Sequence, residues 1–424
     1  MNAIRAVGYQ MFASLRVRNY RLYFIGQGLS FGGNWMQVVA MSWLVLQLTG
    51  SGVALGSVLA CRFAPMLLGG PFAGAVVDAH EKRRILYVTQ SIHATLAFVL
   101  GILVFTGAIQ VWMIFVFAII YGTVDAFDHP TRQTFVHEMV GRENLRNAVT
   151  LNSTEANLAR ALGPLVAGSL IATVGIAFCF IANALSFCAV LFVISRMNSR
   201  EFHRENTEHK PSGHFFESIT YAASVPLIRT VLLMMAAIGT FSYEFQVTLP
   251  LLAQNTFGGA AADYAALVSA MGAGSVAGGL FAVSRRTIDA REFIGSAFLF
   301  GISIGVTAIM PTLGLAIIGM FFVGVFSITL LSLGNTTIQL QAVSAMRGRV
   351  MSLWAMAIFG STVVGAPIIG AIGQFAGARW ALGVSAAASI LAAWYGYKTM
   401  PRGSAFKEDQ GVAAVGPTAD AIKL

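Results

Sequence analysis

Charged residues are scarce in this chain of 424 residues. Asp, Glu, Lys and Arg together make up 11% of the sequence, whereas hydrophobic residues make up 56%, and the mean hydropathy is +0.73. A soluble domain carries about 25% charged residues. The chain therefore has too little charge to cover a surface in water, and its composition predicts an integral membrane protein whose main partner is the lipid bilayer.

Cysteine and catalytic motifs are also lacking. The three cysteines, Cys61, Cys179 and Cys188, all fall within apolar stretches. This placement favours small buried residues over a disulfide framework or a thiolate metal site. The sequence shows no Ser-His-Asp spacing, metal-ligand cluster, Walker loop or dinucleotide fingerprint. We therefore expect no enzyme activity, no metal and no cofactor, and we favour an ion-driven process over an ATP-driven one.

Long apolar runs fill most of the chain instead. A helix needs about 20 apolar residues to cross the hydrocarbon core. Suitable runs lie near residues 22–48, 53–77, 85–106, 110–131, 148–174, 176–195, 228–253, 262–284, 293–310, 313–340, 350–376 and 378–397. Several are separated only by short turns, so consecutive helices must be antiparallel. The sequence therefore predicts an all-α fold of 12 transmembrane helices.

The net charge of +9 is concentrated on one side of these predicted helices. The basic residues of alternate loops are Arg5 to Arg21; Lys82, Arg83 and Arg84; Arg142 and Arg146; Arg196 to Arg229; Arg285, Arg286 and Arg291; Arg347 and Arg349; and Lys398 to Lys423. The opposite loops hold a single basic residue, Arg379. By the positive-inside rule, the basic loops and both termini are cytoplasmic. The basic balance is thus a topology signal, and we expect no nucleic-acid partner.

A polar stretch from Asn198 to Ser218 divides the runs six and six, and the halves echo each other. The segment Arg160-Ala-Leu-Gly-Pro-Leu-Val-Ala-Gly recurs loosely as Val363-Val-Gly-Ala-Pro-Ile-Ile-Gly. Two six-helix pseudo-repeats are typical of secondary transporters. The predicted parts are a cytoplasmic N-terminal segment (1–21), an N-terminal six-helix bundle (22–197), a cytoplasmic linker (198–224), a C-terminal six-helix bundle (225–399) and a flexible cytoplasmic tail (400–424).

The loop after the second predicted helix carries a recognisable motif. It reads Gly74-Ala-Val-Val-Asp78-Ala-His-Glu-Lys82-Arg83-Arg84, and it resembles the Gly-x-x-x-Asp-Arg-x-Gly-Arg-Arg loop of the major facilitator superfamily. Gly74, Asp78, Lys82 and Arg83 match, whereas Ala79 and Glu81 depart from the pattern. We expect Gly74 to allow close helix packing and Asp78 to accept from the amides of a facing helix end. The resemblance implies a latch between the halves, and the alternative is simple positive-inside charge.

A second stretch narrows the resemblance. Residues 125–148, followed by Asn152, Ser153 and the segment from Leu158 to Pro164, resemble the exporter subgroup that contains the enterobactin exporter and macrolide efflux pumps. Gly163-Pro164 is similar to the fifth-helix motif of antiporters in the superfamily. The pair would permit a helix-five bend and close packing, although a structural kink alone is equally compatible.

Six charged residues interrupt the apolar runs: Arg62, Asp125, Asp128, Glu155, Arg160 and Glu244. Charges inside a membrane are costly and are functional candidates by default. Arg62 and Arg160 lie near the predicted midplane, where an arginine needs an anion, and Asp125 and Glu155 are the candidate partners. Alternate protonation of such a carboxylate would couple transport to proton entry.

Structural roles are the alternatives for most of these residues. Asp128 and Arg132, with Glu138, would form a charge network at the cytoplasmic end with Asp78 and Lys82. Glu155 and Arg160 would form a structural pair that locks the fifth helix. Glu244 would be a wetted residue at the outer rim.

The sequence therefore favours a secondary transporter that exports an amphipathic small molecule, such as a drug or siderophore, in exchange for protons. We expect it in the bacterial cytoplasmic membrane, acting as a monomer, by rocking two halves around a midplane cavity. One alternative is an importer or facilitator of the same fold, for lysophospholipids or metal complexes. Another is a membrane-embedded enzyme or sensor, which would need a catalytic cluster or an added soluble domain.

Overall fold

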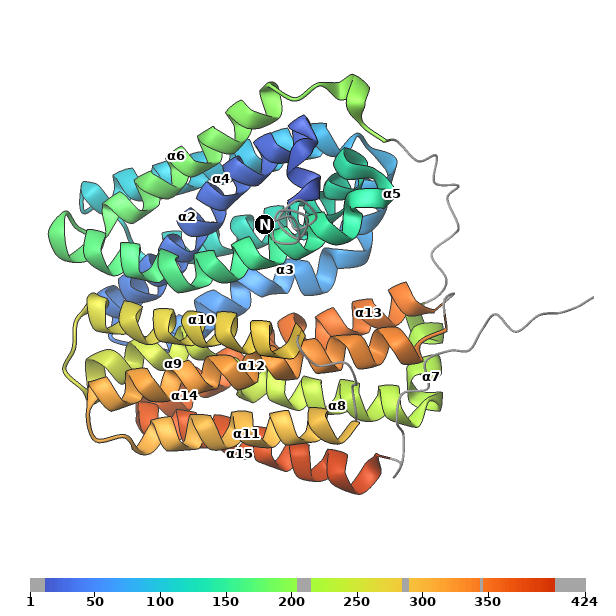
Figure 1. Cartoon of the computed structure of the whole chain (residues 1–424). Helices are drawn as coiled ribbons and strands as arrows, with labels where there is room; N and C mark the ends of the chain where they lie inside the picture. The colour runs from blue at the N-terminus through green and yellow to red at the C-terminus, as the bar shows by residue number, and fades with distance from the viewer. Residues whose placement is uncertain (1–11, 204–214, 284–289, 344–345, 401–424) are drawn as a thin grey trace, which may run out of the picture.

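The computed structural model describes residues 12–203, 215–283, 290–343 and 346–400, and every regular element within them is a helix. The helices form two groups that lie one above the other in Figure 1. The first group contains α2 (Arg18–Thr49), α3 (Gly52–Ala79), α4 (Lys82–Phe105), α5 (Val111–Thr173) and α6 (Ala177–Ser195). The second contains α7 (Phe215–Ser224), α8 (Pro226–Phe241), α9 (Phe245–Leu251), α10 (Ala261–Val283), α11 (Ala290–Ile309), α12 (Leu313–Gln341), α13 (Arg347–Ala355), α14 (Thr362–Phe375) and α15 (Ala378–Thr399).

Each predicted apolar run coincides with one of these helices or with consecutive ones. By length and composition, 8 helical stretches of the described residues could cross a membrane. One of them, Val111–Thr173, spans 63 residues and covers two of the predicted runs. The helices α2, α10 and α15 lie outside this set because polar or small residues lower their hydropathy. The prediction of an all-α membrane protein is confirmed, and the number of twelve spans stays a prediction.

The 63 residues of α5 contain one break, at Gly141, where φ is 66° and ψ is −178°. A positive φ strains residues that carry a side chain, so glycine suits this position. The break falls in the basic loop that the sequence predicted between two runs.

We call the end of the molecule that carries Gly141 and Ser199–Glu201 the linker end. The opposite end, the short-turn end, carries positive-φ glycines at its turns: Gly50, Gly107, Gly175, Gly258 and Gly377.

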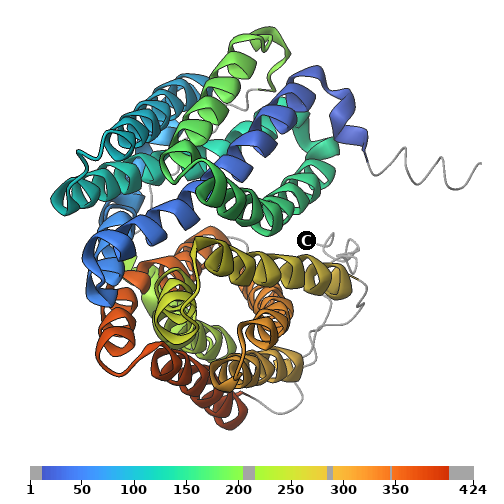
Figure 2. The same ribbon diagram turned by 90° about the vertical axis from the view of Figure 1, so that its left-hand side faces the viewer.

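The two groups touch each other through pairs of helices with small residues. Toward the short-turn end, α3 packs on α14 so closely that a Cβ at Gly56 would collide with the carbonyl oxygen of Ala366. At a second contact between the groups, α5 packs on α10, and a Cβ added at Gly168 would lie 2.8 Å from the Cβ of Ala265. Figure 2 views the molecule from the short-turn end and shows the two groups side by side. Small residues at such contacts let membrane helices approach closely.

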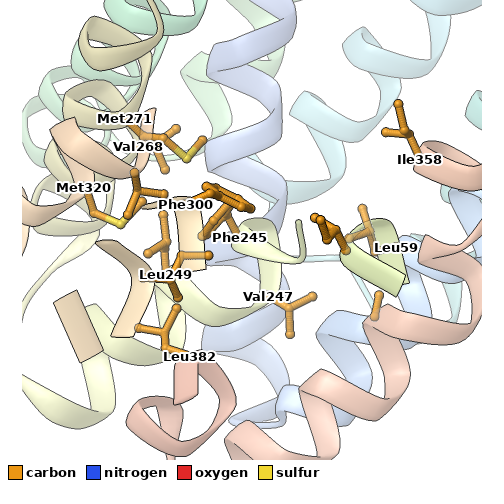
Figure 3. Packing of buried hydrophobic residues seen from close by; sticks show 14 of the residues in the cluster. Leu59, Phe245, Val247, Leu249, Val268, Met271, Phe300, Met320, Ile358 and Leu382 are labelled. Carbon is orange, nitrogen blue, oxygen red and sulfur yellow. The ribbon is translucent and has the colours of Figure 1, made fainter. Parts of the chain in front are cut away.

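Apolar side chains fill the interior of the second group and also cover the outside of the molecule. Figure 3 shows Phe245, Leu249, Val268 and Phe300 packed together in the core, which reaches Leu59 of the first group. Large apolar side chains are also exposed on the outer helix faces, for example Leu68, Trp112, Leu185, Leu280 and Trp394. An apolar exterior around an apolar interior is the arrangement expected of a protein surrounded by lipid.

Both described parts of the predicted linker contain regular structure or hydrogen bonds to the helices. Its last ten residues form α7, and Glu217 of α7 pairs with Arg349 of α13, with 2.8 Å between Oε2 and Nη1. Its first residues are held by Asn19, which exchanges hydrogen bonds with the backbone of Asn198. The predicted domain boundaries stay a proposal. Residues 1–11 of the N-terminal segment, nearly all of the tail, Arg285 and Arg286 lie outside the described residues.

The contact of α3 with α14 generates a prediction about conformation. Gly56→Val should separate the two groups at the short-turn end, because overpacking a tight contact costs about 1–3 kcal/mol. Gly69→Val is the matched control in the same helix, since nothing lies within 4 Å of a Cβ there. Spin labels on Thr106 and Thr312, both exposed at the short-turn end, report the separation. The distance should lengthen in the first variant only, and an unchanged distance would contradict the close contact.

Candidate functional site

A cavity of about 900 Å³ lies between the two helix groups on their linker side. Its wall is mainly made by α2 and α5 of the first group, with one residue each from α3 and α4 and a smaller contribution from the second group. The lining residues that carry polar or charged side chains include Gln27, Asn34, Arg62, His93, Asp125, Asp128, His129, Arg132, Gln133, Asn152, Ser153, Asn157, Arg160, Asn335 and Gln339. Aromatic rings are contributed by Tyr23, Phe31 and Trp35. The cavity is therefore a polar chamber with an aromatic wall, of a size suited to a small molecule.

Arg62 and Asp125 meet at the deep end of this cavity, as the sequence predicted for a midplane pair. Arg62 Nη2 lies 3.3 Å from Asp125 Oδ2, and both side chains are largely buried. The pairing is possible because α3 and α5 approach closely there: a Cβ at Gly122 would collide with the carbonyl oxygen of Arg62. On the other side of Asp125, His93 Nε2 lies 3.5 Å from Oδ1.

Tyr121 organises this deep cluster. The guanidinium of Arg62 lies 4.6 Å from the centre of its ring, and the ring of His93 stacks on it at 4.4 Å. Its hydroxyl donates to Oδ1 of Asn34 at 2.9 Å, which connects α5 to α2. A small pocket of about 40 Å³ lies beyond the cluster, toward the short-turn end, and Arg62 borders both spaces. The cluster thus lies between the open cavity and a nearly filled region.

Asp128 and Arg132 form a second pair, one helical turn further toward the linker end. Arg132 Nε donates to Asp128 Oδ2. The other oxygen of Asp128 accepts from Thr89 Oγ1 at 2.7 Å and Gln90 Nε2 at 2.8 Å, and Asp128 is 2% exposed. The predicted charge network is therefore found in part. Asp128 pairs with Arg132, but Asp78 is exposed, and no ion pair joins Asp78 to this site in the described residues. Charge-assisted bonds in a buried setting make the Asp128 pair a rigid element.

Glu155 and Arg160 do not form the pair that the sequence offered as an alternative. Five residues along a helix turn a side chain by about 140°, so the two point to different faces of α5. Glu155 lies against Gly28, because a Cβ added at Gly28 would collide with Oε1 of Glu155. The other carboxylate oxygen of Glu155, Oε2, is buried without a hydrogen bond. Arg160 faces the cavity, with its guanidinium 5.0 Å from the ring centre of Trp35.

Glu244 is located at a break between α8 and α9, at the N-cap of α9. It is 1% exposed, so the idea of a wetted rim residue is wrong. Both carboxylate oxygens are buried, the hydroxyl of Thr362 is the polar group that interacts with the carboxyl group, and no ion pair reaches Glu244 within the described ranges. Glu155, which is half-buried, and Glu244, which is buried, thus share one property: neither forms an ion pair within the described residues, whereas Asp125 and Asp128 do.

The loop motif behaves differently from its predicted packing role. Nothing lies within 4 Å of a Cβ at Gly74, so no neighbouring helix uses this glycine here. Arg83 donates to the carbonyl oxygens of Ile194 at 2.9 Å and Ser195 at 3.4 Å, and to Ser199 Oγ. Lys82 Nζ reaches the carbonyl oxygen of Asp78 at 3.4 Å. Arg83 therefore ties the end of α6 to the start of the linker.

Gly163 contributes close packing, and the predicted bend at Gly163 and Pro164 stays a prediction. A Cβ at Gly163 would lie 2.6 Å from the Cβ of Trp35, so the glycine lets α5 approach α2 closely. Gly141 is the residue of α5 with non-helical φ and ψ, so the helix continues through Gly163 and Pro164. The contact positions Trp35, which borders the cavity next to Arg160.

Several site residues were missed by the sequence reasoning. His93, Tyr121 and Trp35 are polar or aromatic residues on otherwise apolar helices, and such residues more often pack in a core than form a site. The fold places these three residues next to the charged residues. The sequence does not show this proximity, so it gave no signal for them. In the described part of the chain, no group of three or more His, Cys, Asp and Glu residues could hold a metal ion.

Comparisons with known proteins agree on a transporter. A family model described as transmembrane secretion effector matches residues 9–412. The chain is 31% identical to the staphyloferrin A transporter of Staphylococcus aureus over 176 residues, which cover 41% of this chain and 44% of that protein. That match therefore spans less than half of the relative's length. The multidrug efflux pump Tap of Mycolicibacterium fortuitum is 25% identical over 333 residues, which cover 76% of this chain and 81% of the pump.

A solved structure has the same arrangement of helices. A bacterial homolog of the human lysosomal transporter Spinster, in an inward-facing and unoccupied conformation, superimposes with a TM-score of 0.73. The alignment covers 91% of this chain and 96% of that one, at 13% sequence identity. At this identity the likeness concerns the fold alone. The resemblance read from the loop motif and from residues 125–164 is confirmed.

The buried Asp128 pair generates a prediction about stability. Asp128→Ala should destabilise the protein by about 3–5 kcal/mol, because it leaves the charge of Arg132 buried and unpaired. Asp128→Leu combined with Arg132→Met should recover most of this loss. Glu217→Gln, which breaks the exposed pair with Arg349, is the control and should cost at most about 1 kcal/mol. Thermal unfolding of the purified variants in detergent measures the differences, and an Asp128→Ala protein as stable as the control would contradict the assignment.

Proposed function

The chain belongs to the transmembrane secretion effector family of the major facilitator superfamily and is a multi-pass membrane transporter rather than an enzyme, and from that premise we propose that it exports an amphipathic small molecule in exchange for protons. The observation that carries the proposal is the cavity of about 900 Å³ between the two helix groups, which is lined by charged and aromatic residues and lies on their linker side. Rocking the two groups would expose this cavity to each side of the membrane in turn.

Two kinds of charged group support proton coupling. Asp125 is held by Arg62 at the deep end of the cavity, where a change in the position of α3 relative to α5 would separate the pair. Glu155 is half-buried and Glu244 is buried, and neither forms an ion pair in the described residues. Withdrawing a carboxylate from water without a cation is costly. Such groups suit the uptake of a proton on one side of the membrane and its release when water reaches them on the other. In this mechanism Arg160 and the polar lining bind the cargo.

Orientation and location belong to the same proposal. The basic loops cluster at the linker end, and by the positive-inside rule this end and both termini face the cytoplasm. The cavity would then be open to the cytoplasm in the conformation described, which is the state that loads cargo for export. We place the protein in a bacterial cytoplasmic membrane, where it acts as a monomer.

Import or facilitated diffusion by the same fold is the second candidate, and no contact in the site favours it. The named efflux pump among the relatives matches over 76% of the chain, which supports export. Transport in vesicles of both orientations separates the two directions.

Coupling can be tested in everted vesicles with a compound to which expression of the protein gives resistance. The vesicles should accumulate the compound when a proton gradient is present, and nigericin should abolish the accumulation. Asp125→Asn combined with Glu155→Gln should abolish the accumulation driven by the proton gradient, because neither side chain can then take up and release a proton.

Glu217→Gln is the matched control, since this carboxylate is 59% exposed and belongs to the surface pair with Arg349. It should leave transport unchanged. Accumulation that persists without a proton gradient, or full activity of the double variant, would refute proton exchange.

A further inference from the structure

We propose that Arg160, together with the indole ring of Trp35, forms a subsite that binds an anionic group of the cargo, a carboxylate or sulfonate attached to an aromatic body. This inference rests on the proposed function, because it names the chemistry of the molecule carried in the same cavity. It narrows the cargo from amphipathic molecules in general to amphipathic anions.

The charges that line the cavity do not balance. Three arginines, Arg62, Arg132 and Arg160, face two aspartates, Asp125 and Asp128. Each aspartate already has an arginine partner: Asp125 pairs with Arg62, and Asp128 pairs with Arg132. Among the arginines and aspartates of the lining, one positive charge is left over, and the pairings place it on Arg160.

No carboxylate of the described residues forms an ion pair with Arg160. Glu155 is on another face of α5 and packs against Gly28. The second helix group contributes Asn335, Gln339 and Met351 to the wall, and none of these carries a charge. An arginine stays charged in proteins and needs an anion when it is withdrawn from bulk water. The anion that completes this site is therefore expected from outside the chain.

Trp35 stabilises the guanidinium only partly. A cation over an aromatic ring gains about 0.5–2 kcal/mol, whereas withdrawing an ion from water costs several kcal/mol. The ring is held in place by the close approach of Gly163 to its Cβ. The indole therefore orients Arg160 and leaves its remaining N–H groups available for an anion.

The surroundings also define the rest of the ligand. Ser153, Asn157 and Arg160 recur at helical spacing and share the cavity face of α5. Hydroxyl and amide groups can hydrogen-bond an anion without cancelling its charge. Phe31 and Trp35 supply aromatic surface to the same wall. Together they suit a molecule with a planar apolar part and one negatively charged end.

Binding of two matched dyes to the intact protein tests the subsite. Fluorescein and rhodamine 123 share a xanthene ring, but the first is an anion and the second a cation. Fluorescence anisotropy with the protein in phosphatidylcholine nanodiscs measures both affinities without a proton gradient. The wild type should bind fluorescein more tightly than rhodamine 123.

Arg160→Gln should weaken fluorescein binding by about tenfold to a hundredfold, the loss expected for hydrogen bonds to a charged group, and it should not weaken rhodamine 123. Arg160→Lys should retain part of the affinity for fluorescein, because it keeps the charge without the planar guanidinium. Arg84→Gln is the matched control, since the Arg84 side chain is 85% exposed, and it should change neither affinity.

Equal affinity of the two dyes for the wild type, or no saturable binding of fluorescein to it, would overturn the proposal even if Arg160→Gln did not fold. Unchanged fluorescein binding by a folded Arg160→Gln protein would also overturn it. These outcomes are distinct from failure of the proposed function: a chain that binds fluorescein through Arg160 but moves no cargo against a proton gradient would keep the subsite and lose the exporter assignment.

Discussion

The cost of placing charge in hydrocarbon governs the interior of this protein. A charged side chain in the membrane is tolerated when it is paired or when it faces a polar cavity. Asp128 meets this condition through Arg132, Thr89 and Gln90, and Asp125 meets it through Arg62. Arg160 meets it by facing the cavity, whereas Glu155 and Glu244 form no ion pair in the described part of the chain. Asp128 is thus held rigidly by several partners, whereas the single pair of Asp125 with Arg62 and the groups without an ion pair have the properties that transport needs.

The same constraint shapes the contact between the two helix groups. Between the cavity and the short-turn end, α3 and α14 meet backbone to backbone at Gly56 and Ala366. On the linker side, where the lining is polar, the groups are apart and the cavity opens. An apolar seam that closes through small residues can also separate without exposing an unpaired charge. The arrangement therefore suits two halves that alternate between closed and open contacts.

Much of the fold could be predicted from the sequence, because apolar length and basic loops are local signals. The runs, the polar division near Asn198 and the resemblance of the loop from Gly74 to Arg84 all indicated the fold that the comparisons confirm. The sequence named Asp125 and Glu155 as candidate partners of the midplane arginines, and the structure pairs Arg62 with Asp125. The sequence could not show that Glu155 and Arg160 point apart, because that depends on which face of α5 meets α2. It also could not reveal His93 and Tyr121, whose importance comes from stacking between helices, or the burial of Glu244 at a helix break.

The central claim is that transport requires the two helix groups to separate at the short-turn end. Ser51 Oγ donates to Gln374 Oε1 at 2.6 Å across this end, so a Ser51→Cys, Gln374→Cys protein can be cross-linked there after Cys61, Cys179 and Cys188 are replaced by serine. The account predicts that oxidation of this pair stops transport and that a reductant restores it, while each single cysteine variant stays active under both conditions. Undiminished transport by the fully cross-linked protein would contradict it.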